Sequence, residues 1–283
     1  MRFCRVFRIF TPVYLFVFRN RVILPHKHRP TRKNEVNLHW TGKVNLGDYL
    51  SAVIFDYMIT LGNINRHKKL SKTKHLYSVG SIIGFGFQNA TVWGSGILSL
   101  PARFGGKQKY NRFIRKLDIR MVRGPKTRAF LIQKGYHCPE KYGDPAVLMP
   151  LIYTPQKAEL KNDYIVVLHK DTYIKNENAM SMKTTDYKAF IDEISSSEKV
   201  ISSSLHGIIL AEVYGVPAVL LEDTPSRESI FKFDDYYHST NRFNYPVAKS
   251  IEEAIERIPP PLPNNFDEMR DNLIKTFPYD LWE

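Results

Sequence analysis

Past residue 35, short apolar runs alternate with longer amphipathic stretches along the chain. The short runs have the length of buried strands, and the longer ones carry apolar residues at the three- and four-residue spacing of a helix face. The expected strands are 76–79, 91–93, 119–122, 164–169, 199–201 and 218–221. The expected helices are 50–61, 126–134, 187–194, 208–214, 250–258 and 266–276. This alternation predicts an α/β protein with parallel sheets.

The series is interrupted near its middle. Pro150 and Pro155 follow Gly143-Asp144-Pro145, and the sequence turns polar before a second strand–helix series begins. We therefore expect two Rossmann-like domains that face a cleft, over 36–155 and over 156–283, the second including the final helix. One larger α/β domain is the alternative. Most expected strands end near a glycine or turn residue, and the carboxyl edge of an open parallel sheet is where ligands bind.

Charge separates the first 35 residues from the rest. The chain has 41 Lys and Arg against 28 Asp and Glu, a net charge of +13. Residues 1–35 contain nine basic residues and one acid, a net +8, which leaves only +5 for the remainder. The excess therefore belongs mainly to a leader, and the isoelectric point does not mark the whole chain as a nucleic-acid binder.

The leader is aromatic as well as basic. Four apolar residues between Phe3 and Phe10 share one helical face, and Pro12 should end or kink that helix. No stretch reaches the roughly 20 apolar residues that span a bilayer, and no secretory cleavage site is present. Such a segment suits the surface of an anionic membrane leaflet. The alternative is an extra element packed on the core, with a solvated linker over 25–33.

The most informative stretch is Ser202-Ser203-Ser204-Leu205-His206-Gly207. A buried strand ends there, serines turn the chain, and a helix begins at about Leu205. Free amide groups and the positive end of the helix dipole predict an anion site, with serine hydroxyls as further donors and Gly207 allowing close approach. His206 suits proton transfer or a hydrogen bond to phosphate. The alternative makes the serines helix caps and His206 a structural residue.

Three further regions carry candidate chemistry. Asp48, in Asn45-Leu46-Gly47-Asp48, either caps the first helix or binds sugar hydroxyls or accepts a proton. Arg123, at a strand end, forms a fork on a carboxylate or phosphate, or else a salt bridge with a neighbouring acid. The run from Arg227 to Tyr237, with Lys232, is either a solvated basic loop or a source of cations for an anionic donor.

Other chemistries are not indicated. Two cysteines, Cys4 and Cys138, exclude a disulfide-rich scaffold and a Cys-cluster zinc site, and fit reduced thiols in a cytoplasmic protein. The nine histidines lack metal-ligand spacing, so no metal is expected. Neither a Gly-x-Gly-x-x-Gly motif nor a P-loop is present, so dinucleotide and P-loop nucleotide chemistry are not indicated.

Nine short segments, in order over roughly 40–240, resemble the motifs of the polysaccharide pyruvyl transferase family. Any one of them is weak, but nine in the expected order are fairly specific. They are Asn45-Leu46-Gly47-Asp48, Val79-Gly80-Ser81, Trp93-Gly94-Ser95-Gly96, Val122-Arg123-Gly124-Pro125-Lys126-Thr127, Gly143-Asp144-Pro145-Ala146, Leu168-His169-Lys170-Asp171, Ser202-Ser203-Ser204-Leu205-His206-Gly207, Gly215-Val216-Pro217-Ala218 and Phe231-Lys232-Phe233-Asp234-Asp235-Tyr236-Tyr237.

The resemblance implies a glycosyltransferase-B-like fold and transfer of pyruvate from phosphoenolpyruvate onto two hydroxyls of a sugar, as a ketal. The implied acceptor is a surface polysaccharide or its polyprenyl-linked repeat unit. The implied location is the cytoplasm, with peripheral attachment to the inner face of the cytoplasmic membrane. Phosphoenolpyruvate is then the donor substrate, with no cofactor and no nucleic-acid partner.

The family uses an arginine after its third-strand motif and the histidine of Leu-His-Gly for the donor, which implies roles for Arg123 and His206. Some members have arginine before Leu-His, where this chain has Ser204, so Arg227 or Lys232 becomes the candidate for that cation. His206 would act as general acid or aid phosphate departure, Arg123 would clamp the donor, and Asp48 would serve the acceptor or act as base. The expected substrate-binding residues are Ser203, Ser204, Leu205, Gly207, Arg227, Lys232, His169, Asn45, Gly94 and Ser95.

Two other functions fit the same pattern. A glycosyltransferase of this architecture would place the diphosphate of a nucleotide sugar at the same helix start. A non-catalytic, membrane-attached assembly protein could use a decayed transferase fold, although the retention of Arg123, His206 and Asp48 argues against decay.

Overall fold

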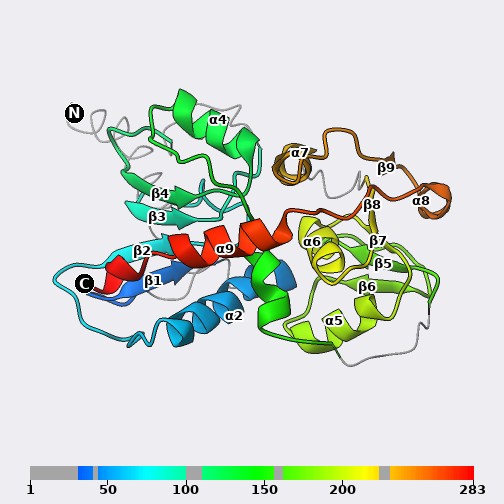
Figure 1. Cartoon of the computed structure of the whole chain (residues 1–283), viewed down its shortest axis with the longest axis horizontal. Coiled ribbons are helices and arrows are strands. Elements are labelled where there is room, and N and C mark those ends of the chain that lie inside the picture. Colours follow the sequence, from blue (N-terminus) through cyan, green and yellow to red (C-terminus); the bar gives the residue numbers. More distant parts are fainter. Residues whose placement is uncertain (1–30, 41–43, 100–109, 156–161, 223–229) are drawn as a thin grey trace, which may run out of the picture.

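The computed structural model describes residues 31–40, 44–99, 110–155, 162–222 and 230–283 (Figure 1). These residues form a four-stranded and a five-stranded sheet, and all the strand pairs are parallel. The predicted α/β class is confirmed, and the two parallel sheets are consistent with two Rossmann-like domains. The predicted domain bounds and the glycosyltransferase-B-like cleft remain predictions.

The first sheet has the order β1-β2-β3-β4. Its strands are β1 (Val36–His39), β2 (Lys74–Tyr77), β3 (Ala90–Trp93) and β4 (Leu117–Met121). Helix α2 (Leu46–Leu61) lies between β1 and β2 in the chain, and α4 (Pro125–Gln133) follows β4. Leu50, Ile54 and Met58 recur every fourth residue on α2 and are fully buried, so this stripe fixes the helix against the core.

The second sheet has the order β6-β5-β7-β8-β9. Its strands are β5 (Ile165–Leu168), β6 (Ala179–Ser181), β7 (Val200–Ser202), β8 (Ala218–Leu221) and β9 (Val247–Ala248). Its helices are α5 (Tyr187–Ser195), α6 (Leu205–Val213), α7 (Ile230–Ser239) and α8 (Ile251–Glu256). The three central strands are buried along their whole length, as expected for parallel strands covered on both faces.

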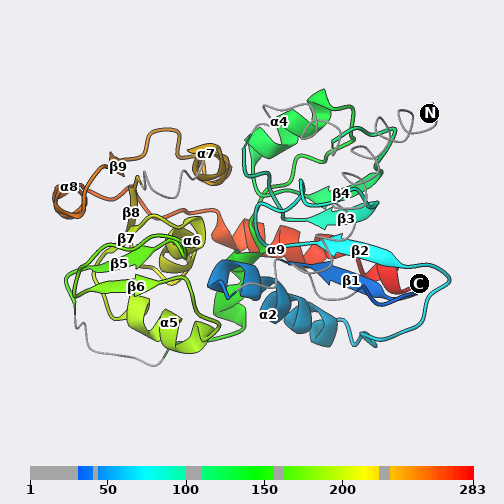
Figure 2. The ribbon, with the colours of Figure 1, turned by 180° about the vertical axis from the view of Figure 1, so that it is seen from behind.

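Two segments join the halves. The 3-10 helix η1 (Pro145–Leu151) contacts α2, α6 and α9 (Phe266–Thr276). Helix α9 returns from the second half and packs on the first, where the indole of Trp93 donates to the carbonyl of Leu273 at 3.0 Å (Figure 2). The final turn η2 (Tyr279–Trp282) continues along the first half. The final helix, expected with the second domain, thus finds its packing partners in the first.

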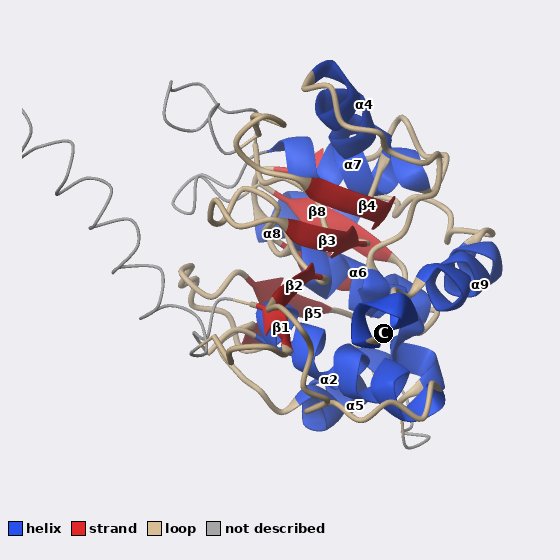
Figure 3. Ribbon diagram, turned by 90° about the vertical axis from the view of Figure 1, so that its left-hand side faces the viewer, coloured by secondary structure: helices blue, strands red, loops and turns tan. Residues whose placement is uncertain are grey.

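Helices lie on both sides of the sheets (Figure 3). Helices α4 and α7 contact each other although they belong to different halves, and α2 lies on the other side of the first sheet from them. No helix within the described residues is long and apolar enough to cross a membrane. The predicted leader helix over 3–10 falls outside the described part of the chain, so it stays a prediction.

Candidate active site

Three turns that are far apart in the sequence meet where the two halves touch. They are the start of α2, which contains Gly47, the turn into η1, which contains Asp144, and the start of α6, which contains His206. The imidazole of His206 lies so close to Gly47 that a Cβ atom there would collide with its Nδ1. On its other side, Nε2 lies 3.4 Å from Oδ2 of Asp144. The peptide N–H of Leu46 also donates to the carbonyl of Met182 at 2.8 Å, so the halves are joined beside the site.

The carboxylate of Asp144 is fully buried, and within the described residues only one of its two oxygens accepts a hydrogen bond. Its Oδ1 accepts the N–H of Ala146 at 3.0 Å and so caps η1. Within the described residues neither Oδ2 nor Nε2 of His206 has a hydrogen-bond partner, and these two buried atoms face each other. An uncompensated buried charge is costly, so the carboxylate favours an imidazole that turns an Nε2–H toward it. That arrangement leaves Nδ1 as the nitrogen for chemistry.

The serine turn before α6 uses its hydroxyls internally. Ser202 Oγ donates to the carbonyl of Val167 at 3.0 Å and accepts the N–H of Ser204 at 3.0 Å. Ser203 Oγ accepts the N–H of His169 at 3.0 Å. The N-cap Ser204 makes no side-chain capping bond, so the amide groups of Leu205 and its two successors remain available at the positive end of the helix. The predicted anion site therefore has its amides, whereas the hydroxyls of Ser202 and Ser203 hold the turn.

Gly207 has a packing role in the structure. A Cβ atom there would collide with Ser202 Oγ and lie 2.6 Å from a methyl group of Val167. The glycine therefore lets α6 approach β5 and β7 closely. The sequence predicted that Gly207 would let a ligand approach the backbone. In the structure, strands β5 and β7 occupy the space beside Gly207.

Asp48 lies beside the same junction, one residue beyond Gly47. Its Oδ2 accepts from Nδ2 of Asn45 at 3.1 Å, and its Oδ1 lies 3.8 Å from the position of a Cβ atom on Gly80. Gly80 follows β2 and has a φ of +103°, which a side chain would strain. Asp48 thus sits in the first turn of α2 at the carboxyl edge of the first sheet. It is half-buried, and its negative charge suits a helix start.

Arg123 is placed differently from the expected clamp. Its guanidinium has no exposed surface and donates to Asp235 Oδ2 at 3.1 Å, Ser81 Oγ at 2.6 Å and the carbonyl of Ile97 at 2.9 Å. Asp235, on α7, also accepts the N–H and hydroxyl of Thr127 at 2.8 and 2.6 Å. The geometry favours the alternative in which Arg123 pairs with a neighbouring acid, and this pair joins the halves.

Of the two interpretations of the run from Arg227 to Tyr237, the solvated basic loop does not hold over the described part, and the supply of cations to a donor stays a prediction. Residues 230–239 form α7, because Phe233, Tyr236 and Tyr237 share one buried face at helical spacing. Lys232 is buried as well, with its ammonium 4.7 Å from the ring centroid of Phe233. The solvated basic loop is thereby corrected to a packed helix. Arg227 lies outside the described residues.

The other expected binding residues line the strand ends. Ser95 Oγ donates to the carbonyl of Gly80 at 2.7 Å, and Gly94, with a φ of +75°, packs directly on the ring of Pro145. Gly94 therefore packs against the turn that holds Asp144, whereas Ser95 holds the turn that follows β2. His169 ends β5 half-buried beside the serine turn. Within the described residues no group of three or more His, Cys, Asp or Glu side chains is arranged to hold a metal ion.

The chain is an α/β protein with two parallel sheets, and a histidine and a carboxylate face each other at a helix start between them. Comparison with known families identifies the family. The model of the polysaccharide pyruvyl transferase family matches residues 45–224, well over half of the chain, and the chain belongs to that family. The predicted resemblance is thereby confirmed.

Two similar proteins carry no assigned activity in their names. An uncharacterized protein of Acanthamoeba polyphaga mimivirus is 25% identical over 225 residues, which cover 73% of this chain and 75% of the viral one. A crystal structure of a functionally uncharacterized protein from Klebsiella pneumoniae covers 79% of this chain and 93% of its own. The two have 14% sequence identity and a TM-score of 0.46.

Sequence reasoning missed two residues of this junction. Asp144 and Gly47 both lie in segments that resemble the family, yet neither received a role. The signal for Asp144 was a carboxylate between a glycine and a proline in a motif. Nothing local in the sequence brings Gly47 next to His206, because that contact forms only when the two halves meet.

Proposed function

We propose that the protein transfers pyruvate from phosphoenolpyruvate to two hydroxyls of a sugar in a surface polysaccharide or its polyprenyl-linked repeat unit. The observation that carries the proposal is the pairing of His206 with the buried Asp144, 3.4 Å apart, at the start of α6. The amides at that start suit the anionic donor, and the imidazole beside them suits proton transfer.

The first step protonates the methylene carbon of the donor. His206 supplies this proton from Nδ1 as an imidazolium, which carries one proton on each nitrogen and keeps its Nε2–H on Asp144. The adjacent carbon becomes oxocarbenium-like, and a sugar hydroxyl attacks it while giving up its own proton. Asp48 is the candidate acceptor of that proton, since it lies in the same turn as Gly47.

The second step breaks the bond between that carbon and the phosphate oxygen. Inorganic phosphate leaves, and the amides at the start of α6 stabilise its charge. A second sugar hydroxyl closes the ring and releases another proton. One proton has entered the new methyl group and two have left the hydroxyls, so donor and sugar become ketal, phosphate and one proton.

Two other residues support the reaction from a distance. Asp144 is a positioning residue, which holds Nε2 of His206 and so keeps Nδ1 directed at the donor. Arg123 joins the halves through Asp235 and orients Ser81 beside Gly80. The buried Lys232 can contact the donor only if α7 changes position, and Arg227 remains a candidate for the same contact. A peripheral place on the inner face of the cytoplasmic membrane, through the basic leader, completes the proposal.

The test is phosphate release from phosphoenolpyruvate, followed by mass analysis of the polysaccharide from a deletion strain. We expect phosphate release that depends on a sugar acceptor, and a polysaccharide that has lost the mass of its pyruvate ketals. His206→Ala should abolish turnover, whereas His137→Ala, at an exposed histidine beyond α4, serves as the control. Release of nucleotide from a nucleotide sugar, with phosphoenolpyruvate inert, would overturn the proposal in favour of a glycosyltransferase.

A further inference from the structure

The entry ends of the strands in the first sheet form a surface far from the candidate active site. The carboxyl ends of these strands lead toward Gly80, Gly94 and Arg123, so the segments that enter the strands lie at the opposite edge. One of them, between α2 and β2, runs at the outer end of the molecule (Figure 1). We name residues 31–35, 63–74 and 111–116 the amino-edge surface.

Hydrogen bonds hold these segments against the sheet. The N–H of Leu70 donates to the carbonyl of Asn34 at 2.9 Å, which ties the segment before β2 to the segment before β1. The N–H of Lys116 donates to Asn89 Oδ1 at 2.7 Å, and the N–H of Ala90 to the carbonyl of Lys116 at 3.1 Å. The surface is therefore a fixed part of the fold.

The exposed charges on this surface are positive. Between Asp56 and Asp118 the chain has eleven Lys and Arg residues and no acid. Lys33, Lys68, Lys72 and Lys116 are all exposed. Within the described residues, none of these four ammonium groups forms an ion pair or hydrogen bond. Cations without partners attract polyanions at long range.

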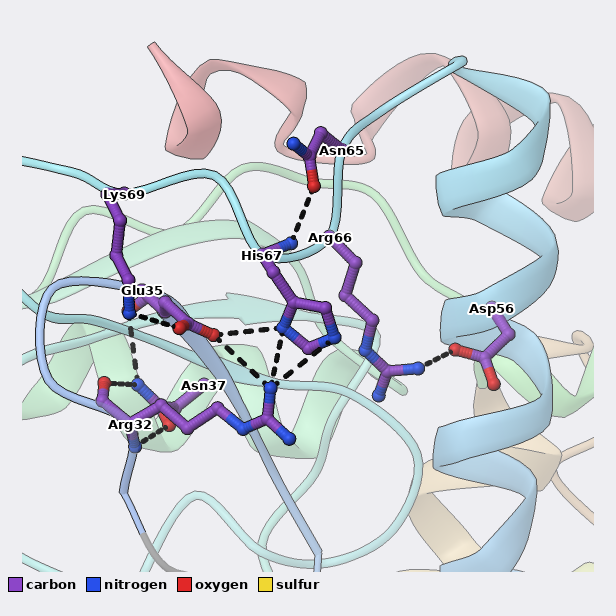
Figure 4. Close-up of polar contacts among 8 residues, drawn as sticks. All are labelled: Arg32, Glu35, Asn37, Asp56, Asn65, Arg66, His67 and Lys69. Atoms are coloured by element: carbon purple, nitrogen blue, oxygen red, sulfur yellow. Dashed lines mark hydrogen bonds and ion pairs between the residues drawn. The ribbon is translucent and has the colours of Figure 1, made fainter.

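The acids near this edge are already neutralised. Glu35 is buried and accepts from Lys69 at 2.6 Å and from the ring of His67 at 3.1 Å, with Arg32 at 3.7 Å (Figure 4). Asp56 pairs with Arg66 in the same view. Asp118 and Asp280 share the guanidinium of Arg120, at 2.9 and 2.6 Å. The exposed Glu283 and the terminal carboxylate follow η2, and they offset only part of the positive charge of the four lysines.

Two apolar side chains protrude from the same surface. Phe113 is 85% exposed and Ile114 is 56% exposed, in the turn that enters β4. Arg112 and Lys116 flank them, and the guanidinium of Arg112 lies 5.0 Å from the ring centroid of Phe113. Single exposed apolar residues are ordinary, but an adjacent pair framed by cations has the composition of a membrane-interface segment.

We propose that the amino-edge surface docks on an anionic lipid membrane. The lysines attract anionic headgroups, and Phe113 and Ile114 enter the interface. An aliphatic side chain beside the aromatic one favours lipid over nucleic acid, whose bases stack on aromatic rings. The 16 residues of α2 separate this surface from the candidate active site by about 24 Å, so docking leaves the site open to substrates.

Vesicle binding tests the proposal without any substrate, so it stands or falls separately from the proposed reaction. The full chain is sedimented with vesicles of phosphatidylglycerol and phosphatidylcholine. We expect Lys68→Ala/Lys72→Ala to weaken binding about 30-fold, at about fivefold per lysine. Phe113→Ser/Ile114→Ser should weaken it at least about tenfold. The matched controls in the second half are Lys175→Ala/Lys183→Ala and Ile258→Ser, where Ile258 is also 85% exposed.

A labelled residue separates this surface from the basic leader, which can also bind vesicles. In a Cys4→Ser background, an environment-sensitive dye is attached to Ile114→Cys or, as control, to Ile258→Cys. Cys138 is buried and stays unlabelled. We expect a blue shift with anionic vesicles at position 114 and none at position 258.

Three results would overturn the proposal. The first is wild-type vesicle binding by both amino-edge variants. The second is no dye response at position 114 while the protein sediments with vesicles. The third is tight binding of duplex DNA that depends on these lysines, together with vesicle binding that does not.

Discussion

The two edges of the first sheet use charge in opposite ways. At the carboxyl edge the charges are buried and paired, as in Arg123 with Asp235 and His206 with Asp144. At the amino edge Lys33, Lys68, Lys72 and Lys116 are exposed, and within the described residues they have no ionic partner. A buried pair fixes geometry, whereas an exposed cluster attracts a distant partner. One sheet can thus carry reaction chemistry at one edge and attachment at the other.

This difference between the edges changes where the excess cations of the body are placed. The sequence interpretation places a few cations of the body at the donor site. The structure instead buries Arg123 and Lys232, while residues 63–74 alone carry five cations and no acid at the far edge. A count of charges gives their sum, but only the fold shows which of them face solvent.

The largest expected effect comes from breaking the buried pair that joins the halves. Asp235→Ala leaves the guanidinium of Arg123 buried without a carboxylate, which should lower the free energy of unfolding by about 3–5 kcal/mol. Thermal and denaturant unfolding measure the change. Asp271→Ala is the control, because its i,i+4 pair with Lys275 is exposed and its loss should cost less than about 1 kcal/mol. Equal losses in the two variants would contradict the contrast between buried and exposed charge.

The second effect concerns the carboxylate that faces His206. In Asp144→Asn the amide oxygen can still accept the N–H of Ala146, but an NH₂ group then faces Nε2. The imidazole proton should move to Nδ1, and kcat should fall by about 10²–10⁴-fold with little change in KM. The ¹⁵N shifts of the imidazole report the tautomer without substrate, and steady-state kinetics give the rate.

A double-mutant cycle separates this positioning role from a general loss of structure. Asp144→Asn should add no further loss once His206→Ala is present, because the two residues act as a unit. Losses that multiply, or an unchanged tautomer in Asp144→Asn, would show that the carboxylate does not act through His206.

A smaller effect is expected where α2 approaches the imidazole. Gly47→Ala suits the helix, since alanine favours it by up to about 1 kcal/mol, but the new Cβ collides with Nδ1 of His206. Activity should fall about 10–100-fold through displacement of the ring. In the His206→Gly background the ring and its Cβ atom are both absent, so the same substitution should raise the unfolding midpoint. No loss of activity in Gly47→Ala would show that the ring can move without consequence.

Local patterns predicted the elements that carry a strong period. The helices over 187–195 and 266–276 and the strand over 218–221 lie within about one residue of their expected bounds. Strands β1, β6 and β9 were missed, because two to four residues without a continuous apolar run are too few to show a pattern. Helix α7 was missed for another reason. Its charged residues are typical of a solvated loop, although Phe233, Tyr236 and Tyr237 share one buried face.

The sequence predicted which segments contribute to the candidate site, but not which residues contact each other there. His206 and Asp48 were found because strand–turn–helix junctions place side chains at a sheet edge. Their contacts with Asp144 and Gly47 could not be predicted, because both depend on how two separately folded halves meet. The partner of Arg123 could not be predicted from the sequence either. A strand-end arginine is the same in sequence whether it meets a ligand or Asp235.

The smallest expected effect tests how the acid at the amino edge is neutralised. A hydrogen bond from Lys69, aided by one from His67, lowers the pKa of Glu35 from 4.5 to about 2. Because this pKa is lowered on folding, the stability it contributes is present above about pH 4.5 and lost as the pH falls toward 2. Denaturant unfolding of wild type and Glu35→Gln should therefore differ at pH 7 and converge as the pH falls below about 2.

The same variant sharpens the contrast between the two edges. Glu35→Gln releases Lys69 and Arg32 from their acid, so anionic vesicles should bind it up to about fivefold more tightly than wild type. Phosphate release should stay unchanged, because Glu35 lies at the opposite edge from His206. A stability difference that is constant with pH would contradict the pairing of Glu35, and weaker vesicle binding would contradict the role of the amino-edge surface as an anion-attracting face.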